Sequence, residues 1–295
     1  MDGSVLQRRL AALVGDWYAE HARELPWRAP GVSAWAVLVS EIMLQQTPVH
    51  RVLPVWREWL ARWPTPQDLA VEPAAEVIRA WGRLGYPRRA LRLHECAKAL
   101  VERHGGEVPR EVEALLALPG IGSYTARAVA VFAYGDRHPV VDTNVRRFVA
   151  RAVTALADAG PPRTVADLAA VEELLPADPA DAARASIAFM ELGALICTAR
   201  APRCADCPVY AECGWQRAGR PAATGPARKV QKFAGTDRQV RGLLMAVLRE
   251  ATAPVPRAAL DAVWQDGTQR ERALAGLLDD GLVHRLPGDR YALPS

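Results

Sequence analysis

Four cysteines near one another in the sequence form the clearest candidate for a metal site. Cys197, Cys204, Cys207 and Cys213 follow the spacing Cys-x6-Cys-x2-Cys-x5-Cys, and the loop that holds the last three is polar and proline-containing. Thiolates crowded into such a loop are typical of metal ligands. Zinc sites usually pair two short Cys-x2-Cys knuckles, whereas one short spacing flanked by longer ones favours a cubane iron–sulfur cluster. The pattern therefore predicts iron–sulfur, with zinc as the alternative.

A glycine-containing run, Leu118-Pro-Gly-Ile-Gly-Ser-Tyr-Thr125, lies between two helical patterns. Gly120 and Gly122 permit a tight turn whose bare backbone N–H groups, at the start of the second helix, are suited to approach a phosphate. The run predicts a helix-hairpin-helix that grips a nucleic-acid backbone. The alternative is an ordinary helical hairpin that uses Pro and Gly only to turn.

Two carboxylates sit in unusually apolar surroundings. Glu41 lies within Val37-Leu-Val-Ser-Glu-Ile-Met-Leu, and Asp142 follows Val140-Val141. A carboxylate held in a low-dielectric pocket has a raised pKa, which would make Glu41 a proton donor near neutrality. The plainer alternatives are a charge on the exposed face of a helix for Glu41 and a helix N-cap for Asp142.

The composition limits the class of protein. The 295 residues are 50% apolar and 24% charged, as in globular proteins, and the net charge of +4 permits an acidic partner. The chain has only three lysines, so arginine carries nearly all the basic charge, which suits phosphate contacts or reflects coding bias. We expect no membrane span, no signal peptide and a cytoplasmic protein without disulfides.

The elements that would position these residues are helices. Apolar residues recur at helical spacing and strand signals are scarce over the first two-thirds, which predicts an all-α fold. The predicted helices cover residues 5–22, 33–46, 52–62, 74–83, 89–103, 110–116, 123–134, 144–155 and 181–195.

A separate C-terminal domain is predicted at 236–295, after a linker at 217–235 that is rich in Gly, Pro and charge. Thr236 and Gln239 fit a capping box, two shorter helices follow the first, and a Pro-Gly-Asp turn closes a terminal hairpin. These elements predict a small winged-helix-like domain. Its role stays open between added DNA contact, through residues 268–278 or Arg285 and Arg290, and a stabilising or docking cap.

Taken together, the motifs resemble those of the helix-hairpin-helix (HhH-GPD, or endonuclease III) DNA glycosylase superfamily, and within it the adenine glycosylases of MutY type. The resembling segments lie between residues 5 and 216: Leu25-Pro-Trp-Arg28, Ser40-Glu-Ile-Met-Leu-Gln-Gln-Thr47, Gly82-Arg-Leu-Gly-Tyr86, Leu118–Thr125, Val141-Asp-Thr-Asn144, Met190-Glu-Leu-Gly-Ala-Leu-Ile-Cys197 and the remaining cluster cysteines.

The resemblance implies a glycosylase region over residues 1–216. A six-helix barrel module would span 23–134, and residues 1–22 with 135–216 would form a module carrying a [4Fe-4S] cluster. The partner would be double-stranded DNA containing a mismatch, bound by a monomer in the cytoplasm at the nucleoid, with the target nucleotide flipped out of the stack.

The resemblance also implies roles for single residues. Glu41 would protonate the departing adenine and Asp142 would stabilise the cationic sugar, the two roles of paired carboxylates in glycoside hydrolysis. Tyr124 and Asn144 would orient these two carboxylates. The base pocket and the DNA contacts would be formed by Trp27, Arg28, Gln46, Leu84, Tyr86, Gly120 and Gly122.

Departures from the pattern refine the activity. Lyases of the superfamily have a Schiff-base lysine where this chain has Tyr124, and no lysine lies between Lys98 and Lys229, so we expect base removal without efficient strand cleavage. Ile187 stands where many relatives have an adenine-reading glutamine. The expected activity is excision of adenine opposite guanine or 8-oxoguanine. The alternatives are a thymine or uracil mismatch glycosylase and a non-catalytic DNA-binding protein.

Overall fold

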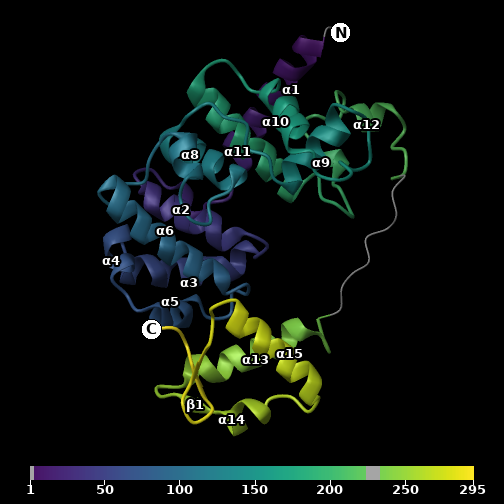
Figure 1. Ribbon diagram of the computed structural model, residues 1–295. Coiled ribbons are helices and arrows are strands. Elements are labelled where there is room, and N and C mark those ends of the chain that lie inside the picture. The colour runs from purple at the N-terminus through teal and green to yellow at the C-terminus, as the bar shows by residue number, and fades with distance from the viewer. Residues whose placement is uncertain (1–2, 224–232) are drawn as a thin grey trace. The chain divides into compact units, whose positions relative to one another are not determined.

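The computed structural model describes residues 3–223 and 233–295, and its regular elements are helices except for a small sheet near the C-terminus (Figure 1). The all-α expectation is therefore confirmed. Internal contacts divide the chain into two compact units. The first contains Met1–Leu38, Pro109–Ala117 and Ile121–Ala227, and the second contains Val39–Val108, Leu118–Gly120 and Arg228–Ser295. In the described residues, no helix has the length and apolar character of a membrane span.

The first unit is built mainly on three long helices and several short ones. Its elements are α1 (Gly3–His21), η1 (Pro26–Arg28), the start of α2 (Ala34–Leu44), α7 (Val112–Leu116), α8 (Ser123–Tyr134), α9 (Thr143–Ala152), α10 (Thr164–Glu172), α11 (Pro179–Leu195), η2 (Cys204–Asp206) and α12 (Gly214–Arg217). Helix α11 packs against both α1 and α9. The predicted modules, with boundaries at 23, 134 and 216, stay predictions.

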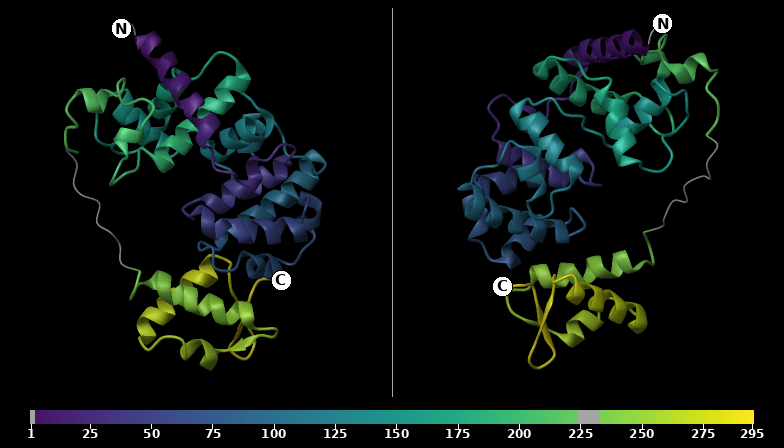
Figure 2. Two further views of the ribbon diagram at one scale, coloured as in Figure 1. Left: turned by 180° about the vertical axis from the view of Figure 1, so that it is seen from behind. Right: turned by 45° about the horizontal axis from the view of Figure 1, so that its top comes forward.

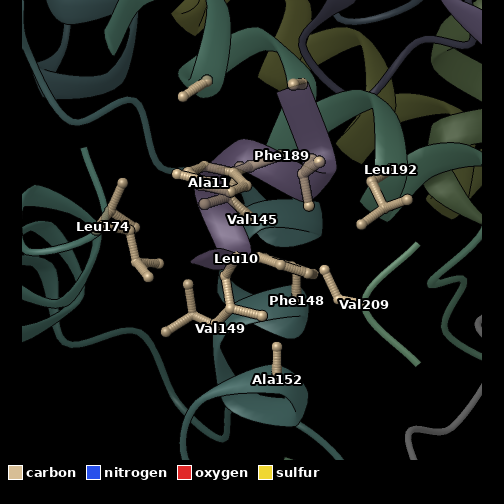
Figure 3. Packing of buried hydrophobic residues seen from close by; sticks show 14 of the residues in the cluster. Leu10, Ala11, Val145, Phe148, Val149, Ala152, Leu174, Phe189, Leu192 and Val209 are labelled. Atoms are coloured by element: carbon tan, nitrogen blue, oxygen red, sulfur yellow. The ribbon is translucent and has the colours of Figure 1, made fainter. Parts of the chain in front are cut away.

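The core of this unit joins α1 to α9 and α11 (Figure 3). Leu10 from α1 is fully buried, and the rings of Phe148 and Phe189 stack with their centroids 5.3 Å apart. Burial of these side chains supplies the apolar surface that a helix of this length needs in order to be stable. The N-terminal helix is thereby fixed to the segment that follows Asp142.

The second unit continues α2 into α3 (Val49–Arg62), α4 (Pro66–Ala70), α5 (Ala74–Trp81) and α6 (Arg88–His104). Its interior contains three fully buried tryptophans. The ring of Trp59 meets those of Trp63 and Trp81 edge-on, at centroid distances of 4.6 and 5.7 Å. Edge-to-face contacts add to the burial energy of such large rings. The tryptophan contacts therefore join α3 to α5.

The C-terminal domain belongs to this second unit. It contains α13 (Asp237–Glu250), β1 (Val255–Pro256), α14 (Arg257–Asp261), α15 (Gly267–Asp279), β2 (His284–Leu286) and β3 (Arg290–Ala292). The sheet is antiparallel in the order β1-β3-β2, and Figure 2 shows α13 and α15 side by side in both views. Three helices and a terminal hairpin are the predicted elements, and β1 is an addition to them. Residues 224–232 of the predicted linker lie outside the described residues.

The predicted capping box at α13 is wrong. The Thr236 hydroxyl donates to the carbonyl oxygen of Phe233, and the side-chain oxygen of Gln239 accepts from the amide of Gly235. Both side chains therefore stabilise the turn before the helix. Gln239 binds the amide of Gly235, whereas in a capping box it would bind the amide of Thr236.

Candidate active site and cluster loop

Glu41 lies in the middle of α2 among buried neighbours. Its exposed fraction is 5%, and the residues on either side of it, Ser40 and Ile42, are 0% and 3% exposed. The alternative of a solvent-facing charge is therefore excluded. The helix is apolar around its whole circumference, as expected of a buried helix, and a carboxylate placed there is shielded from bulk water.

Asp142 is the N-cap of α9, and both of its oxygens are occupied. Oδ1 accepts from the amides of Asn144 (2.8 Å) and Val145 (2.7 Å), and Oδ2 accepts from Nδ2 of Asn144 (2.7 Å). Burial raises the pKa of Asp142 above its ordinary value, although these three hydrogen bonds act in the opposite direction. The N-cap expected as the plainer alternative is thus present, and it fixes the carboxylate rigidly.

An arginine that the sequence analysis did not single out links this cap to the cysteine loop. Arg147 donates to Oδ1 of Asn144 (2.8 Å), to the carbonyl oxygen of Gly193 (2.5 Å) and to that of Cys197 (2.6 Å). Gly193 allows α9 and α11 to approach closely, because a Cβ there would lie 2.7 Å from the backbone oxygen of Asn144. The signal in the sequence was an arginine one turn after the cap, opposite the glycine of the Met-Glu-Leu-Gly motif.

Tyr124 stands in the first turn of α8. Its hydroxyl donates to the sulfur of Met190 at 3.9 Å, and its ring packs against a small cluster that includes Val140, two residues before Asp142. Tyr124, Asn144 and Asp142 thus belong to one unit of the structure, whereas Glu41 belongs to the other.

Arg28 is anchored by a buried ion pair. Glu191, with a side chain that is 0% exposed, accepts two hydrogen bonds from the Arg23 guanidinium at 2.7 Å and one from Arg28 at 3.0 Å. Although burial alone would raise it, these arginines lower the pKa of Glu191 to about 2. In the described residues, Nη1 of Arg28 is buried without a hydrogen-bond partner. Trp27, in η1, is 5% exposed.

Two loops of the second unit, residues 45–47 and 82–87, are joined by Arg89. Its buried guanidinium donates to the carbonyl oxygens of Met43 (3.0 Å) and Gly85 (3.0 Å) and to the hydroxyl of Thr47 (2.9 Å). We call these segments the paired loops. Desolvation lowers the pKa of Arg89 to about 10, so it stays protonated at neutral pH.

The paired loops bring three predicted DNA-contact residues together. Gln46 and Tyr86 line one solvent-open pocket with Arg88, Arg89 and Arg92, and both adopt positive φ angles, 55° and 48°. Strained backbone of this kind persists where surrounding structure enforces it, often at functional sites. Leu84 differs, because its side chain is 4% exposed and packs inward.

The two glycines of the predicted hairpin, Gly120 and Gly122, differ in why glycine is present. Gly120 has a φ of 77°, and a Cβ on it would lie 2.8 Å from Cβ of Arg92, so only glycine fits there. Gly122 is the N-cap of α8 with ordinary extended angles, and a Cβ on it would meet no atom within 4 Å. The space in front of Gly122 leaves room for a ligand to approach the first turn of α8.

The four cysteines of the predicted cluster line one cavity, which is partly open to solvent. The floor includes Arg151, whose guanidinium donates to Sγ of Cys197 (3.4 Å) and lies 4.8 Å from the ring centroid of Trp215. Burial, with the other three cysteines nearby, raises the pKa of the Cys207 thiol to about 12. Within the described residues, no three His, Cys, Asp or Glu side chains converge to hold a single metal ion.

Comparison with known proteins identifies the family. A family model described as HhH-GPD superfamily base excision DNA repair protein matches residues 39–173. The chain is 59% identical over 278 residues to an adenine DNA glycosylase of Mycolicibacterium smegmatis, covering 94% of this chain and 93% of the relative. It is 57% identical over 279 residues to the Mycobacterium tuberculosis protein of the same name, covering 94% and 91%. The solved structure of a thermostable thymine-DNA glycosylase matches with a TM-score of 0.65 and 25% identity, over 72% of this chain and 98% of the other. The chain therefore belongs to the HhH-GPD superfamily of base excision DNA repair proteins.

Proposed function

We propose that this protein is a DNA glycosylase that removes adenine mispaired with guanine or 8-oxoguanine. The observation that carries the proposal is the match to curated adenine DNA glycosylases over 94% of the chain, a share that must extend into the C-terminal domain. Such a reaction requires a proton donor and a negative charge, which the buried Glu41 and the fixed carboxylate of Asp142 would supply.

The reaction begins with proton transfer. Adenine is a poor leaving group as an anion, so Glu41 donates a proton to N7 of the extruded base. The bond between C1′ and N9 then breaks with its electron pair moving to N9, which leaves an oxocarbenium-like sugar. A water molecule adds to C1′ and loses a proton, which restores the acid form of Glu41, and the products are free adenine and an abasic site.

Asp142 stabilises the positive charge on the sugar. Its carboxylate is held by three hydrogen bonds from α9, so it is already oriented before the charge develops. Asn144 supplies two of these hydrogen bonds, and Arg147 holds the amide oxygen of Asn144. Asn144 and Arg147 are therefore positioning residues.

DNA strand cleavage is not part of the proposed activity. A lyase of this superfamily would need a lysine at the position of Tyr124, and the hydroxyl of Tyr124 cannot form a Schiff base. Arg28 contributes a buried, unpartnered N–H group and Trp27 an apolar surface to the proposed base pocket. The paired loops and the glycines of the hairpin would hold the DNA around a nucleotide that is flipped out.

The cysteine cavity fits a [4Fe-4S] cluster. Each iron of a cubane takes one thiolate, so its four ligands surround a body instead of converging on a point, as the lining of the cavity by Cys197, Cys204, Cys207 and Cys213 allows. When bound, the cluster would cross-link the loop. Arg151, which donates to Sγ of Cys197, would offset part of the negative charge of the thiolates.

The test is a substrate panel. Duplexes containing A·G, A·8-oxoG, T·G or U·G are incubated with the protein and then treated with alkali, which cleaves at abasic sites. We expect alkali-dependent cleavage at adenine in the first two, and intact strands without alkali. Excision of thymine or uracil would assign the chain to the other mismatch glycosylases, and binding without excision of any base would make it a non-catalytic DNA-binding protein.

The enzyme would act as a monomer at the nucleoid in the cytoplasm.

A further inference from the structure

The C-terminal domain is fixed to the segment of the second unit that carries Tyr86. Ile78 of α5 is fully buried in the domain's own apolar core. Arg79 donates to the carbonyl oxygen of Arg249 at 3.2 Å, and Arg249 in turn donates to that of Gly82 at 2.6 Å. The domain is therefore anchored to α5 and to the first residue of the 82–87 loop by buried apolar surface and by reciprocal hydrogen bonds.

One exposed side chain of the domain reaches the tip of that loop. Arg238, in the first turn of α13, donates a hydrogen bond from Nη2 to the hydroxyl of Tyr86. Its guanidinium carbon lies 5.0 Å from the centroid of the Tyr86 ring, within the range of a cation–π contact. Arg89, from the loop's own helix, lies 5.6 Å from the same ring.

The contact orients Tyr86 without covering it. The Tyr86 side chain is still 42% exposed, although two guanidinium groups contact its ring and its hydroxyl is bonded. The backbone φ of 48° is already held by the bonds of Arg89 to Gly85 and to the other paired loop. Arg89 thus restrains the backbone of the loop, and Arg238 restrains the aromatic side chain that the loop presents.

No ion pair within the described residues holds Arg238 beside Tyr86. The nearby arginines Arg88 and Arg241 pair with Asp280 of the C-terminal domain. Among residues 3–223 and 233–295, no carboxylate lies within salt-bridge distance of Arg238. The aromatic ring and the hydroxyl of Tyr86 are therefore the groups that hold Arg238 in place in this part of the structure.

We propose that Arg238 is a positioning residue for Tyr86, and that the C-terminal domain takes part in mismatch binding through this side chain. The inference rests on the proposed function, in which the paired loops hold the DNA around the flipped nucleotide, and it adds that Tyr86 stacks on a base there. An exposed tyrosine loses side-chain entropy when it stacks on a base. Arg238 removes much of that freedom in the free protein, and preorganisation of this kind strengthens binding of the distorted duplex.

The test combines binding with a local fluorescent probe. A duplex carries A·G with 2-aminopurine, which brightens on unstacking, next to the mismatch, and a fully paired duplex is the reference. Arg238→Ala should weaken mismatch binding about fivefold to tenfold, the size expected for one cation–π contact and one charge-assisted hydrogen bond. It should also reduce the rise in 2-aminopurine fluorescence. Arg238→Lys, which keeps the charge, should recover part of both signals.

Coupling to Tyr86 is the decisive measurement. In a Tyr86→Ala background, Arg238→Ala should cause little further change, because its partner is already gone. Arg62→Ala is the matched control, since Arg62 is also exposed and lies over a tryptophan ring, that of Trp63, at 4.5 Å. It should leave binding and fluorescence unchanged. Urea unfolding of each variant checks that the fold is kept.

Three results would overturn the inference. The first is mismatch binding and fluorescence of Arg238→Ala equal to those of wild type. The second is an equal loss of binding from Arg238→Ala with and without Tyr86. The third is a loss of binding on substitution of Arg285 or Arg290 but not of Arg238. Because binding and fluorescence need no excision, failure here is distinguishable from failure of the proposed function. In the latter case the wild-type protein itself would not prefer the A·G duplex.

Discussion

Asp142 combines two functions in one carboxylate. It caps α9 through the amides of Asn144 and Val145, and in the proposed reaction it faces the cationic sugar. The two functions make different demands, because a cap needs only an oxygen that accepts hydrogen bonds, whereas charge stabilisation needs the full negative charge.

Substitution separates these functions. Asp142→Asn should keep the cap and lower the single-turnover excision rate about 10²- to 10³-fold, the usual cost of losing one preorganised electrostatic group. Asp142→Ala should lower the rate similarly and also lose about 1 kcal/mol of stability. Asp178, which caps α11 by accepting from the amide of Asp181, is the control: Asp178→Ala should cost stability alone. Full activity in Asp142→Asn would remove Asp142 from the chemistry.

Sequence patterns identified Glu41 and Asp142 but not the residues that hold the site together. Glu41 was recognisable because a carboxylate is rare in so apolar a run, and its burial follows from the same pattern. Glu191 and Arg89 carried no such signal, because each acts through partners that are distant in the sequence. Arg23, for example, precedes Glu191 by 168 positions. In the sequence, such charged residues cannot be distinguished from ordinary surface residues, because their partners are brought near only by folding.

At the scale of elements, helix periodicity was informative and short elements were not. The long helices were predicted to within a few residues, because each buries one apolar stripe. Helices α4 and α10 were missed because each directly follows a proline-containing turn. Strand β1 was missed because it has two residues and one is Pro256. Pairing with β3 defines it, and the local sequence does not.

The close approach of α9 and α11 depends on Gly193. Gly193→Ala would place a Cβ against the backbone of Asn144, which neither helix can relieve without shifting. We expect a loss of about 1–3 kcal/mol in the free energy of unfolding and a reduced excision rate, because Asn144 positions Asp142. Gly15→Ala in α1 is the control. Its Cβ would meet no atom within 4 Å, so this variant should gain about 0.5–1 kcal/mol. Equal effects of the two substitutions would contradict the packing argument.

The ion pair of Glu191 joins η1 and the end of α1 to α11, and it makes stability depend on pH. The folded-state pKa is about 2, below the ordinary value of 4.5, so the pair stabilises the fold above pH 4.5 and loses its contribution as pH falls towards 2. Its size at neutral pH is roughly 3 kcal/mol at most.

Glu191→Gln should therefore be less stable than wild type at pH 7, with a difference that shrinks as pH falls below about 4.5. Urea unfolding monitored by circular dichroism from pH 7 to 3 measures this difference. Parallel pH profiles for the two proteins would show that the carboxylate is not held in its charged form by Arg23 and Arg28.

At the scale of the whole molecule, the proposed cluster would cross-link the 197–213 loop. Four cysteines line its cavity, and Arg147 and Arg151 bind its backbone at Cys197 and Thr198. Cys204→Ala should lower the iron bound per chain and the broad visible absorption of the purified protein, and weaken DNA binding. Cys96→Ala is the control, because this cysteine is buried in α6 and is not among the residues that line the cavity. Iron content that is unchanged by Cys204→Ala would exclude the assigned ligand, and zinc in place of iron would exclude the cluster.

The central claim concerns both units of the chain, since Glu41 and Asp142 belong to different ones and are proposed to act on the same nucleotide. The most direct test is single-turnover excision of adenine from an A·8-oxoG duplex by Glu41→Gln, with the affinity for that duplex measured alongside. We predict mismatch affinity close to that of wild type and an excision rate lower by about 10²- to 10⁴-fold, the usual contribution of a general acid. An excision rate equal to that of the wild-type protein would contradict the account.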